Sequence, residues 1–157
     1  MISVGIITVR DRVSRGEYED RGGPARRQFC DERGWKVTGQ AVVPDEQPLI
    51  QAKTKELTGT CKLVLLTGGT GIAERDVTPD AVRAIATKEL PGFGEVMRAK
   101  SFDRFPQAIL SRSMAAVVGK SLVICLPGNP KGAVECLEFV AAAIPHATEL
   151  LSGHTAH

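Results

Sequence analysis

Apolar runs alternate along the chain with segments whose apolar residues recur at helical spacing. Runs bounded by polar loops predict buried strands, and alternating stretches predict half-buried ones; these strands occupy residues 2–9, 35–43, 62–67, 114–118 and 121–126. The segments between them predict a helix starting at Pro24 and helices over 46–57, 78–86, 91–100 and 131–144, the last interrupted by Pro145. This order predicts an α/β fold, a three-layer α/β/α sandwich around a mostly parallel sheet.

The dipeptide Gly119-Lys120 separates the last two predicted strands. Two residues including a glycine between apolar runs are typical of a β-hairpin, so we expect one of these strands to run antiparallel to the rest. No internal repeat or linker divides the sequence, and its 157 residues fit a single domain over 1–157.

Composition narrows the classes of function. Twenty Lys and Arg residues against eighteen Asp and Glu leave a net charge of +2, and only seven residues are aromatic. A general nucleic-acid binder has a larger basic excess and more aromatic rings, so we expect no nucleic-acid partner. We expect no membrane span, because no run approaches the roughly 20 apolar residues that one requires. The four cysteines form no CxxC pair, which favours reduced, buried thiols, including Cys125, and a cytoplasmic protein.

The stretch 98–120 contains five cations and a single carboxylate, that of Asp103. Two interpretations remain open for it: a patch that attracts a small anion, or a solvated face. Ser111 and Arg112 lie in this stretch just before a predicted strand, so an anion contact and a solvated turn are both compatible with their position.

Polar or glycine-rich loops follow four of the predicted strands. Arg10, Asp11, Arg12 and Ser14 follow the first, Asp45 the second, the loop 68–71 the third, and Pro127, Gly128 and Pro130 the last. In an open parallel sheet, ligands bind outside the carboxyl ends of the strands. We therefore expect these four loops to open on one edge of the sheet and to share one site.

The glycine loop, Gly68, Gly69, Thr70 and Gly71, has two interpretations. Glycines let backbone N–H groups approach an anion closely, and the helix expected to begin near Thr78, with Thr78 as its cap, adds its dipole for phosphate binding. Gly-Gly is equally typical of a plain tight turn. A dinucleotide fingerprint is excluded, because GxGxxG should follow the first strand, where this chain reads RDRVSRG.

Asp45 and Asp76 are the candidate metal-binding pair. Each follows a strand end, so their carboxylates are expected to face one another across the cleft. Two carboxylates there suit Mg²⁺, which takes one or two acidic ligands beside phosphate oxygens and water. In the alternative interpretation their roles are local: Asp45 caps the next helix, and Asp76 closes an Asx turn before Thr78.

Six stretches carry a resemblance to one known family. They are ITVRDRVSRGEYEDRGGP (7–24), VPDE (43–46), LLTGGTGIAERDVTPDA (65–81), LPGFGEVMR (90–98), AILSRS (108–113) and LPGNPKGAVE (126–135). Together they span nearly the whole chain and are similar, in the same order, to the molybdenum-cofactor biosynthesis proteins of the MogA/MoaB type, which include the G domain of gephyrin. GEYEDRGGP, RDVTPD and PGFGE resemble the adenylyltransferase branch of this family.

The resemblance implies a reaction, a set of roles and a molybdopterin-binding-like fold. The family's adenylyltransferases join the terminal phosphate of molybdopterin to AMP from ATP and release pyrophosphate, and a separate molybdenum insertase uses the product. Asp45 and Asp76 match the two essential carboxylates, whose implied role is to hold Mg²⁺ on the ATP phosphates. The family also implies a homotrimer. The implied substrate-binding residues are Asp11, Arg12, Ser14, Gly68, Gly69, Thr70, Gly71, Thr78, Gly92, Glu95, Ser111, Arg112, Pro127, Gly128 and Pro130.

Two other functions are compatible with the sequence. One is a carrier or MoaB-like paralogue that binds molybdopterin without chemistry of its own, and the other is an unrelated nucleotide-binding α/β domain. Two positions depart from the family pattern: Arg10 and Gly132 each stand where many relatives carry Ser. We expect Arg10 to change how the pterin or phosphate is held, and Gly132 to deprive the last long helix of a capping hydroxyl.

Overall fold

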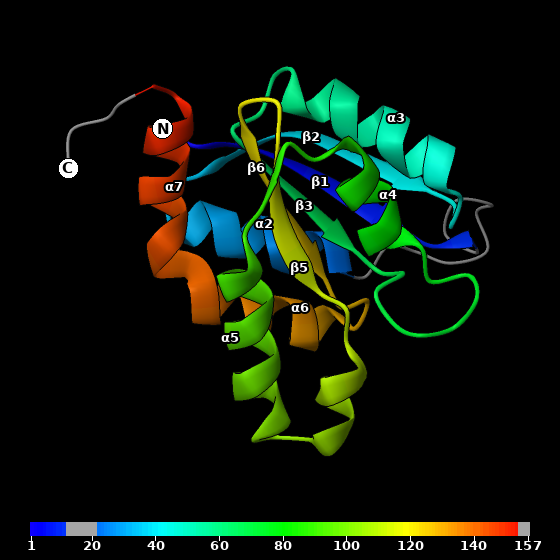
Figure 1. Cartoon of the computed structure of the whole chain (residues 1–157). Coiled ribbons are helices and arrows are strands. Elements are labelled where there is room, and N and C mark those ends of the chain that lie inside the picture. Colours follow the sequence, from blue (N-terminus) through cyan, green and yellow to red (C-terminus); the bar gives the residue numbers. More distant parts are fainter. Residues whose placement is uncertain (12–21, 154–157) are drawn as a thin grey trace.

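The centre of the protein is one six-stranded sheet, and the computed structural model describes residues 1–11 and 22–153 (Figure 1). The strands are β1 (Ser3–Val9), β2 (Lys36–Val43), β3 (Leu63–Thr67), β4 (Lys88–Glu89), β5 (Met114–Val118) and β6 (Ser121–Leu126), in the spatial order β2-β1-β3-β6-β5-β4. β2, β1, β3 and β6 are parallel, and β5 is antiparallel to both its neighbours. The predicted strands and the single antiparallel strand are confirmed. β4 has no counterpart among the predictions, because its two exposed polar residues carry no apolar pattern.

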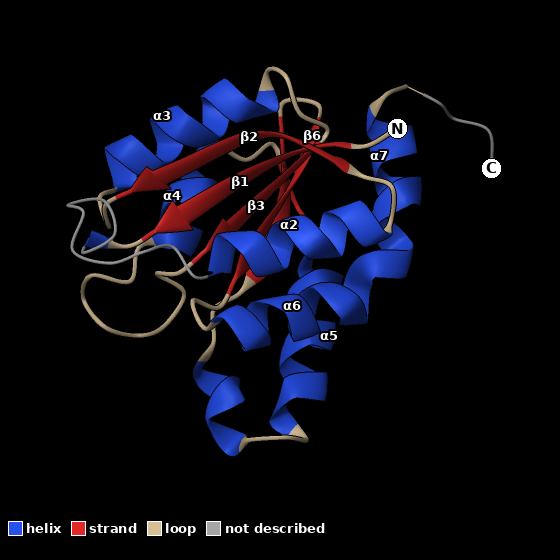
Figure 2. Ribbon diagram, turned by 180° about the vertical axis from the view of Figure 1, so that it is seen from behind, coloured by secondary structure: helices blue, strands red, loops and turns tan. Residues whose placement is uncertain are grey.

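Helices cover both faces of the sheet (Figure 2). On one face lie α3 (Gln47–Thr58) and α4 (Thr78–Ile85), and on the other lie α2 (Gly22–Glu32), α5 (Pro91–Phe102), α6 (Pro130–Val140) and α7 (Ile144–Leu151). Two short 3-10 helices, η1 (Pro106–Leu110) and η2 (Ala141–Ala143), lie in connections. This arrangement confirms the predicted three-layer α/β/α sandwich.

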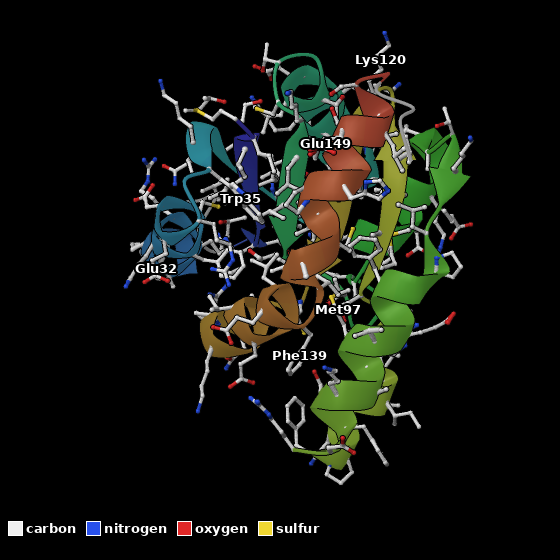
Figure 3. The ribbon with its side chains drawn as sticks, turned by 90° about the vertical axis from the view of Figure 1, so that its left-hand side faces the viewer. Glu32, Trp35, Met97, Lys120, Phe139 and Glu149 are labelled. Atoms are coloured by element: carbon white, nitrogen blue, oxygen red, sulfur yellow. The ribbon has the colours of Figure 1, made fainter. Side chains whose placement is uncertain are left out.

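Apolar side chains of the central strands point alternately to the two helical layers. Leu63 and Leu65 of β3 join the cluster on the side of α2, α5, α6 and α7, whereas Val64 and Leu66 join the cluster on the side of α3 and α4. All four are completely buried, because a central parallel strand is covered by helices on both faces. Trp35 extends the first cluster next to α2 (Figure 3).

The last predicted helix is divided in the structure, which corrects the expected span 131–144. α6 ends at Val140, and the 3-10 turn η2 leads into α7. Pro145 explains the division: it has no N–H to continue the helical hydrogen bonds, while its fixed φ suits the first turn of a new helix. It stands in that turn of α7.

Two helix starts also differ from expectation. Asn129 caps α6 by accepting a hydrogen bond from the Gly132 N–H at 3.0 Å, so the helix has a cap without a hydroxyl at position 132. The cap position of α4 is Val77, not Thr78. Thr78 is the first residue of the helix, and its N–H, which has no acceptor within the helix, donates to the Gly69 carbonyl at 3.1 Å.

The parallel strands end level with one another. Val9 pairs with Val43, Thr8 with Thr67, and Thr67 with Leu126. The loops after β1, β2, β3 and β6 therefore start from one edge of the sheet. The chain leaves β1 toward α2 on one face and leaves β3 toward α4 on the other. A crevice between two such strands is where open α/β sheets bind ligands.

Candidate functional site

Two glycines let the loops fold closely over the crevice between β1 and β3. Gly68 has a φ of +99°, its N–H donates to the Leu126 carbonyl at 3.1 Å, and a Cβ added to it would lie 2.3 Å from the Val9 carbonyl oxygen. A Cβ added to Gly128 would lie 3.3 Å from the Gly68 Cα. Both the positive φ and the contact exclude a side chain at position 68. The glycine loop is therefore held against the ends of three strands.

The rest of the glycine loop offers backbone donors. In the described part of the chain, the N–H groups of Gly69, Thr70 and Gly71 have no hydrogen-bond acceptor. The loop is joined to the start of α4 through the bond between the Gly69 carbonyl and the Thr78 N–H. Free N–H groups beside a helix N-terminus form an arrangement that binds phosphate, which favours the phosphate interpretation over a plain turn.

Asp45 and Asp76 both lie beside this loop, next to Gly69 and Gly71. The Oδ1 atom of Asp45 is 3.1 Å from the position that a Cβ of Gly69 would take, and the Oδ2 atom of Asp76 is 2.8 Å from the corresponding position at Gly71. A side chain at either glycine would therefore crowd the carboxylate that lies next to it. The loops after β2 and β3 therefore bring both candidate ligands to the same place.

The environment of Asp45 disfavours a negative charge. Partial burial and then the charge of Asp11 raise the pKa of the Asp45 carboxyl above its ordinary value, and Asp76 adds to this repulsion. A hydrogen bond from the Asp11 backbone and the charge of Arg75 act in the opposite direction. A cation would relieve the repulsion, and oxygen donors suit Mg²⁺. Within the described residues no three His, Cys, Asp or Glu side chains converge to hold a metal, so such a cation would be shared with a ligand's oxygens.

Neither local role considered for the two carboxylates is found as predicted: the Thr78 N–H donates to the Gly69 carbonyl, so Asp76 forms no Asx turn before Thr78. Glu46 occupies the cap position of α3 and no side chain caps that helix, so Asp45 has no capping role. Asp76 accepts a hydrogen bond from the Ala73 N–H through Oδ2 at 2.9 Å, and its own N–H donates to the Ala73 carbonyl at 2.9 Å. Asp76 therefore closes a local turn and also presents a carboxylate beside the loop.

Arg112 reaches the loop from the segment before β5. Its Nε donates to the Gly71 carbonyl at 2.9 Å, its Nη2 donates to the Asp76 carbonyl, and Nη1 and Nη2 each donate to the Asp80 carboxylate at 3.0 Å. Its backbone N–H donates to the Thr70 carbonyl at 2.7 Å. The structure thus shows an arginine bonded to its own protein, and its contact with a substrate stays a prediction.

Arg75 and Asp80 belong to the site although neither was predicted to bind substrate or metal. Arg75 forms an ion pair with Asp11 through Nη2 and Oδ2, 2.5 Å apart. The other Asp11 oxygen accepts a hydrogen bond from the Asp45 N–H at 2.9 Å. The only sequence signal for Arg75 and Asp80 is their place in the stretch RDVTPD (75–80), around Asp76.

A cavity of about 350 Å³ lies between the glycine loop, α5 and η1. Thr70, Gly71, Ser111 and Pro127 line one part of it, and apolar side chains of Ile72, Met97, Phe105 and Leu110 line another. An apolar wall next to free N–H donors suits a ring that carries a phosphate group. The cavity therefore extends the loop cluster into a site large enough for part of a nucleotide or pterin.

The structure does not bring every predicted substrate residue to this cluster. Gly92 and Glu95 are exposed on the first half of α5, and Gly92 lines a different groove together with Phe139. The reason is the position of β4, the strand that precedes α5. β4 is the outermost strand and is separated from β3 by β6 and β5, so the helix begins to the side of the glycine loop.

The remaining predicted residues are placed as follows. Thr78 has a fully buried hydroxyl without a hydrogen-bond partner among the described residues, 2.3 Å from the position of a Cβ at Gly69. Pro130 begins α6, directly after the loop that carries Gly128. Arg12 and Ser14 lie outside the described residues.

The basic stretch 98–120 does not form one anion-binding patch. Arg98 is bonded to the Ser113 carbonyl at 2.7 Å. Arg104 pairs with Glu135 at 2.9 Å, and it lies over the ring of Phe139 on α6. Figure 3 shows Lys120 far from Phe139, at the other end of the sheet.

The state of the cysteines and the length of the helices can be compared with what the composition predicts. All four cysteines are free and buried, and Cys125 is completely buried within the cluster on the side of α3 and α4, which confirms its place in the core. This burial raises the pKa of its thiol to about 12. Over residues 1–11 and 22–153, no helix has the length and apolar character that crossing a membrane requires.

Comparison with known proteins finds relatives over nearly the whole chain. A family model described as "Probable molybdopterin binding domain" matches residues 5–146. The curated molybdopterin adenylyltransferase of Helicobacter pylori is 43% identical over 98% of this chain and 89% of its own length. That of Escherichia coli is 39% identical over 97% and 86%. The crystal structure of the molybdopterin biosynthesis enzyme MoaB from Thermus thermophilus has 41% identity and a TM-score of 0.91, with 98% of each chain covered.

Replacing Gly68 by alanine is expected to destabilise the protein by about 1–3 kcal/mol, because the new Cβ meets the Val9 carbonyl at a positive φ. Gly132→Ala is the matched control: its Cβ would find its nearest atom at 3.7 Å, within a helix that alanine favours. Urea unfolding of both variants measures the difference. Equal stability of the two would contradict the close approach at position 68.

Asp45→Asn is expected to raise the Tm of the free protein at pH 7. The folded-state pKa of Asp45 lies above its unfolded value, so its ionisation disfavours the folded state. The loss of folding stability begins as the pH rises through the unfolded-state pKa of about 3.9, and it is complete once the pH exceeds the folded-state pKa of Asp45. The gain in Tm should therefore shrink near pH 3, whereas exposed Glu46→Gln should leave Tm unchanged at both pH values. Thermal unfolding checks this, and a lower Tm of Asp45→Asn at pH 7 would contradict it.

Proposed function

The chain belongs to the family of probable molybdopterin binding domains, and from this premise we infer that it is a molybdopterin adenylyltransferase of molybdenum cofactor biosynthesis. Curated relatives of that name are 39–43% identical over nearly the full chain. In the structure, the supporting observation is a glycine loop with free N–H groups, beside which lie the carboxylates of Asp45 and Asp76. The enzyme is a nucleotidyltransferase that uses ATP and molybdopterin.

The reaction exchanges one phosphorus–oxygen bond for another. An oxygen of the terminal phosphate of molybdopterin bonds to the α-phosphorus of ATP, the bond from this phosphorus to the oxygen that bridges to the β-phosphate breaks, and pyrophosphate leaves. Such transfers depend on positioning and charge neutralisation more than on covalent help from the protein. The N–H groups of Gly69, Thr70 and Gly71 would bind phosphate oxygens, and the apolar part of the adjoining cavity would receive a substrate ring.

Mg²⁺ bound to ATP is the proposed partner of Asp45 and Asp76. The oxygen donors of the pair fit this cation, and its charge would relieve the repulsion that raises the pKa of Asp45. Bound there, Mg²⁺ would neutralise charge on the ATP phosphates. The two carboxylates, which lie beside Gly69 and Gly71, would orient the nucleotide toward the N–H donors.

The family resemblance further leads us to propose a homotrimer, delivery of the product to a molybdenum insertase and a cytoplasmic location. An exposed apolar groove of about 530 Å³ between α5 and the C-terminal helices, lined among others by Phe93, Val96 and Phe139, supports an assembly. Grooves of this kind are typical of surfaces that another chain covers. The four free cysteines fit a reducing compartment.

Asp45→Asn and Asp76→Asn are each expected to lower AMP transfer by about 10²–10³-fold, because each removes a charge that holds the phosphates in place. The assay combines protein, ATP, Mg²⁺ and molybdopterin and follows the mass of the pterin product together with pyrophosphate. Glu46→Gln removes an exposed neighbouring carboxylate that caps nothing and should retain wild-type transfer.

Molybdopterin binding should persist in both Asp variants. Transfer that survives both substitutions would remove the two carboxylates from the mechanism. A wild-type protein that binds molybdopterin without adding an adenylyl group to it would be a carrier or MoaB-like paralogue.

Asp11→Asn is expected to move the acidic limb of the pH profile of kcat/KM to lower pH. Asp11 raises the pKa of Asp45, and Asn keeps an oxygen that can accept the Asp45 N–H while removing the charge. Asp45 would then stay ionised, and able to hold its cation, at lower pH. Initial rates between pH 4 and pH 8 measure the limb. An unchanged or upward-shifted limb would show that ionisation of Asp45 does not control it.

A further inference from the structure

Arg112 and Asp80 form a two-point ion pair at the edge of the site. Nη1 and Nη2 of Arg112 each lie 3.0 Å from one carboxylate oxygen of Asp80. Two parallel bonds of this kind fix the plane of a guanidinium group. Asp80 stands in the first turn of α4, whereas Arg112 precedes β5, so the pair joins segments 32 residues apart.

With its plane fixed, Arg112 directs other donors to the loop. Nε donates to the Gly71 carbonyl at 2.9 Å, and Nη2 also donates to the Asp76 carbonyl. Four of the five guanidinium N–H donors therefore have partners in the chain. Two-point binding of a substrate phosphate by Arg112 would require some of these bonds to break. The guanidinium group thus acts on the protein rather than on an anion.

These bonds position two groups that the proposed reaction uses. Gly71 has one of the free N–H groups of the loop, and Asp76 carries a carboxylate beside it. Since one rigid guanidinium plane holds the carbonyls of both residues, it constrains where the N–H donor and the carboxylate lie relative to each other.

The pair itself contributes little to folding stability. The side chains of Arg112 and Asp80 are 31% and 41% exposed, and exposed ion pairs are weak because water screens them. Hydrogen bonding between the two lowers the pKa of Asp80 and raises that of Arg112, so both are charged at neutral pH. Loss of the pair is therefore expected to change local geometry more than stability.

We propose that Asp80 and Arg112 are positioning residues of adenylyl transfer, which hold the Gly71 and Asp76 carbonyls so that the glycine loop and the Asp76 carboxylate meet the same phosphate group. The proposal rests on the proposed function, because it assigns the pair to that reaction. In this proposal Arg112 acts by holding other groups of the protein in place and does not contact the substrate directly.

Steady-state kinetics tests the proposal. Asp80→Asn and Arg112→Lys are each expected to lower kcat by about 10–100-fold while KM for ATP and for molybdopterin stays within about threefold of wild type, since small displacements of reacting groups slow the chemical step. Lysine keeps the charge of Arg112 but cannot bridge three acceptors in one plane. Because both changes break one unit, the double variant should be about as slow as the slower single variant. Asp80→Glu, which keeps the carboxylate fork, should restore most of kcat.

Glu89→Gln is the matched control. It breaks another exposed ion pair of α4, between Arg83 and Glu89 at 2.9 Å, and it should retain the wild-type kcat. A higher KM with unchanged kcat in Arg112→Lys would assign Arg112 to substrate binding and overturn the proposal. Losses that multiply in the double variant would overturn it as well, because they would show two independent roles.

Amide hydrogen exchange separates failure of this proposal from failure of the proposed function. The N–H groups of Ala73, Asp76 and Thr78 are hydrogen-bonded within the loop. They are expected to exchange about threefold faster or more in Asp80→Asn and Arg112→Lys, with amides of β3 and β6 unchanged. This readout requires no turnover, so a wild-type protein without AMP transfer would refute the proposed function, while unchanged exchange in the loop, or faster exchange throughout the sheet, would refute the positioning role.

Discussion

The carbonyl oxygen of Val9 and the backbone of Gly68 approach so closely that no side chain fits between them, and the site depends on this contact. Parallel pairing of β1, β3 and β6 brings the ends of these strands level. Glycine at position 68, faced by Gly128, then allows the loop after β3 to turn directly over the crevice. Gly69 and Gly71 repeat the principle on a smaller scale: a Cβ at Gly69 would meet the Thr78 hydroxyl and, less closely, the Asp45 carboxylate, and a Cβ at Gly71 would meet the Asp76 carboxylate.

Negative charge is concentrated in the crevice before a substrate arrives. Asp11 and Asp76 raise the pKa of Asp45, and Arg75 offsets part of the repulsion. Arg112, the other cation beside the loop, is bound to Asp80 and to two carbonyls. Functional sites often keep such unfavourable arrangements at a cost in stability. The free N–H donors suit a phosphate group, whereas the neighbouring carboxylates repel a bare anion and attract a cation. A nucleotide that carries a bound metal ion would satisfy both groups, and a bare anion would not.

Much of the fold and the outline of the site could be predicted from the sequence. β3 and β6 are apolar on both faces, which identifies them as buried central strands. Residues directly after parallel strands lie at the same edge of the sheet, so Asp45 and the glycine loop could be predicted to lie near one another. The partners of Arg112 could not be predicted, because they depend on how the segment before β5 lies against α4, 32 residues away in sequence. A cation in a basic stretch is as compatible with anion binding as with a protein contact, and only the geometry distinguishes the two. The cap of α4 was missed for a similar reason, since the Thr78 N–H finds its acceptor in the glycine loop.

One helix, α5, lines both the cavity beside the glycine loop and the separate apolar groove, although the family resemblance implied that Gly92 and Arg112 both bind substrate. The later part of α5 lies at the cavity, where Arg98 binds the Ser113 carbonyl and a Cβ added to Gly94 would come within 2.7 Å of that oxygen. Its first turn, with Gly92, lines the apolar groove. The stretch PGFGE therefore contributes to both surfaces through α5: Gly92 lines the groove, and the missing side chain of Gly94 lets the helix approach the segment before β5, which also carries Arg112.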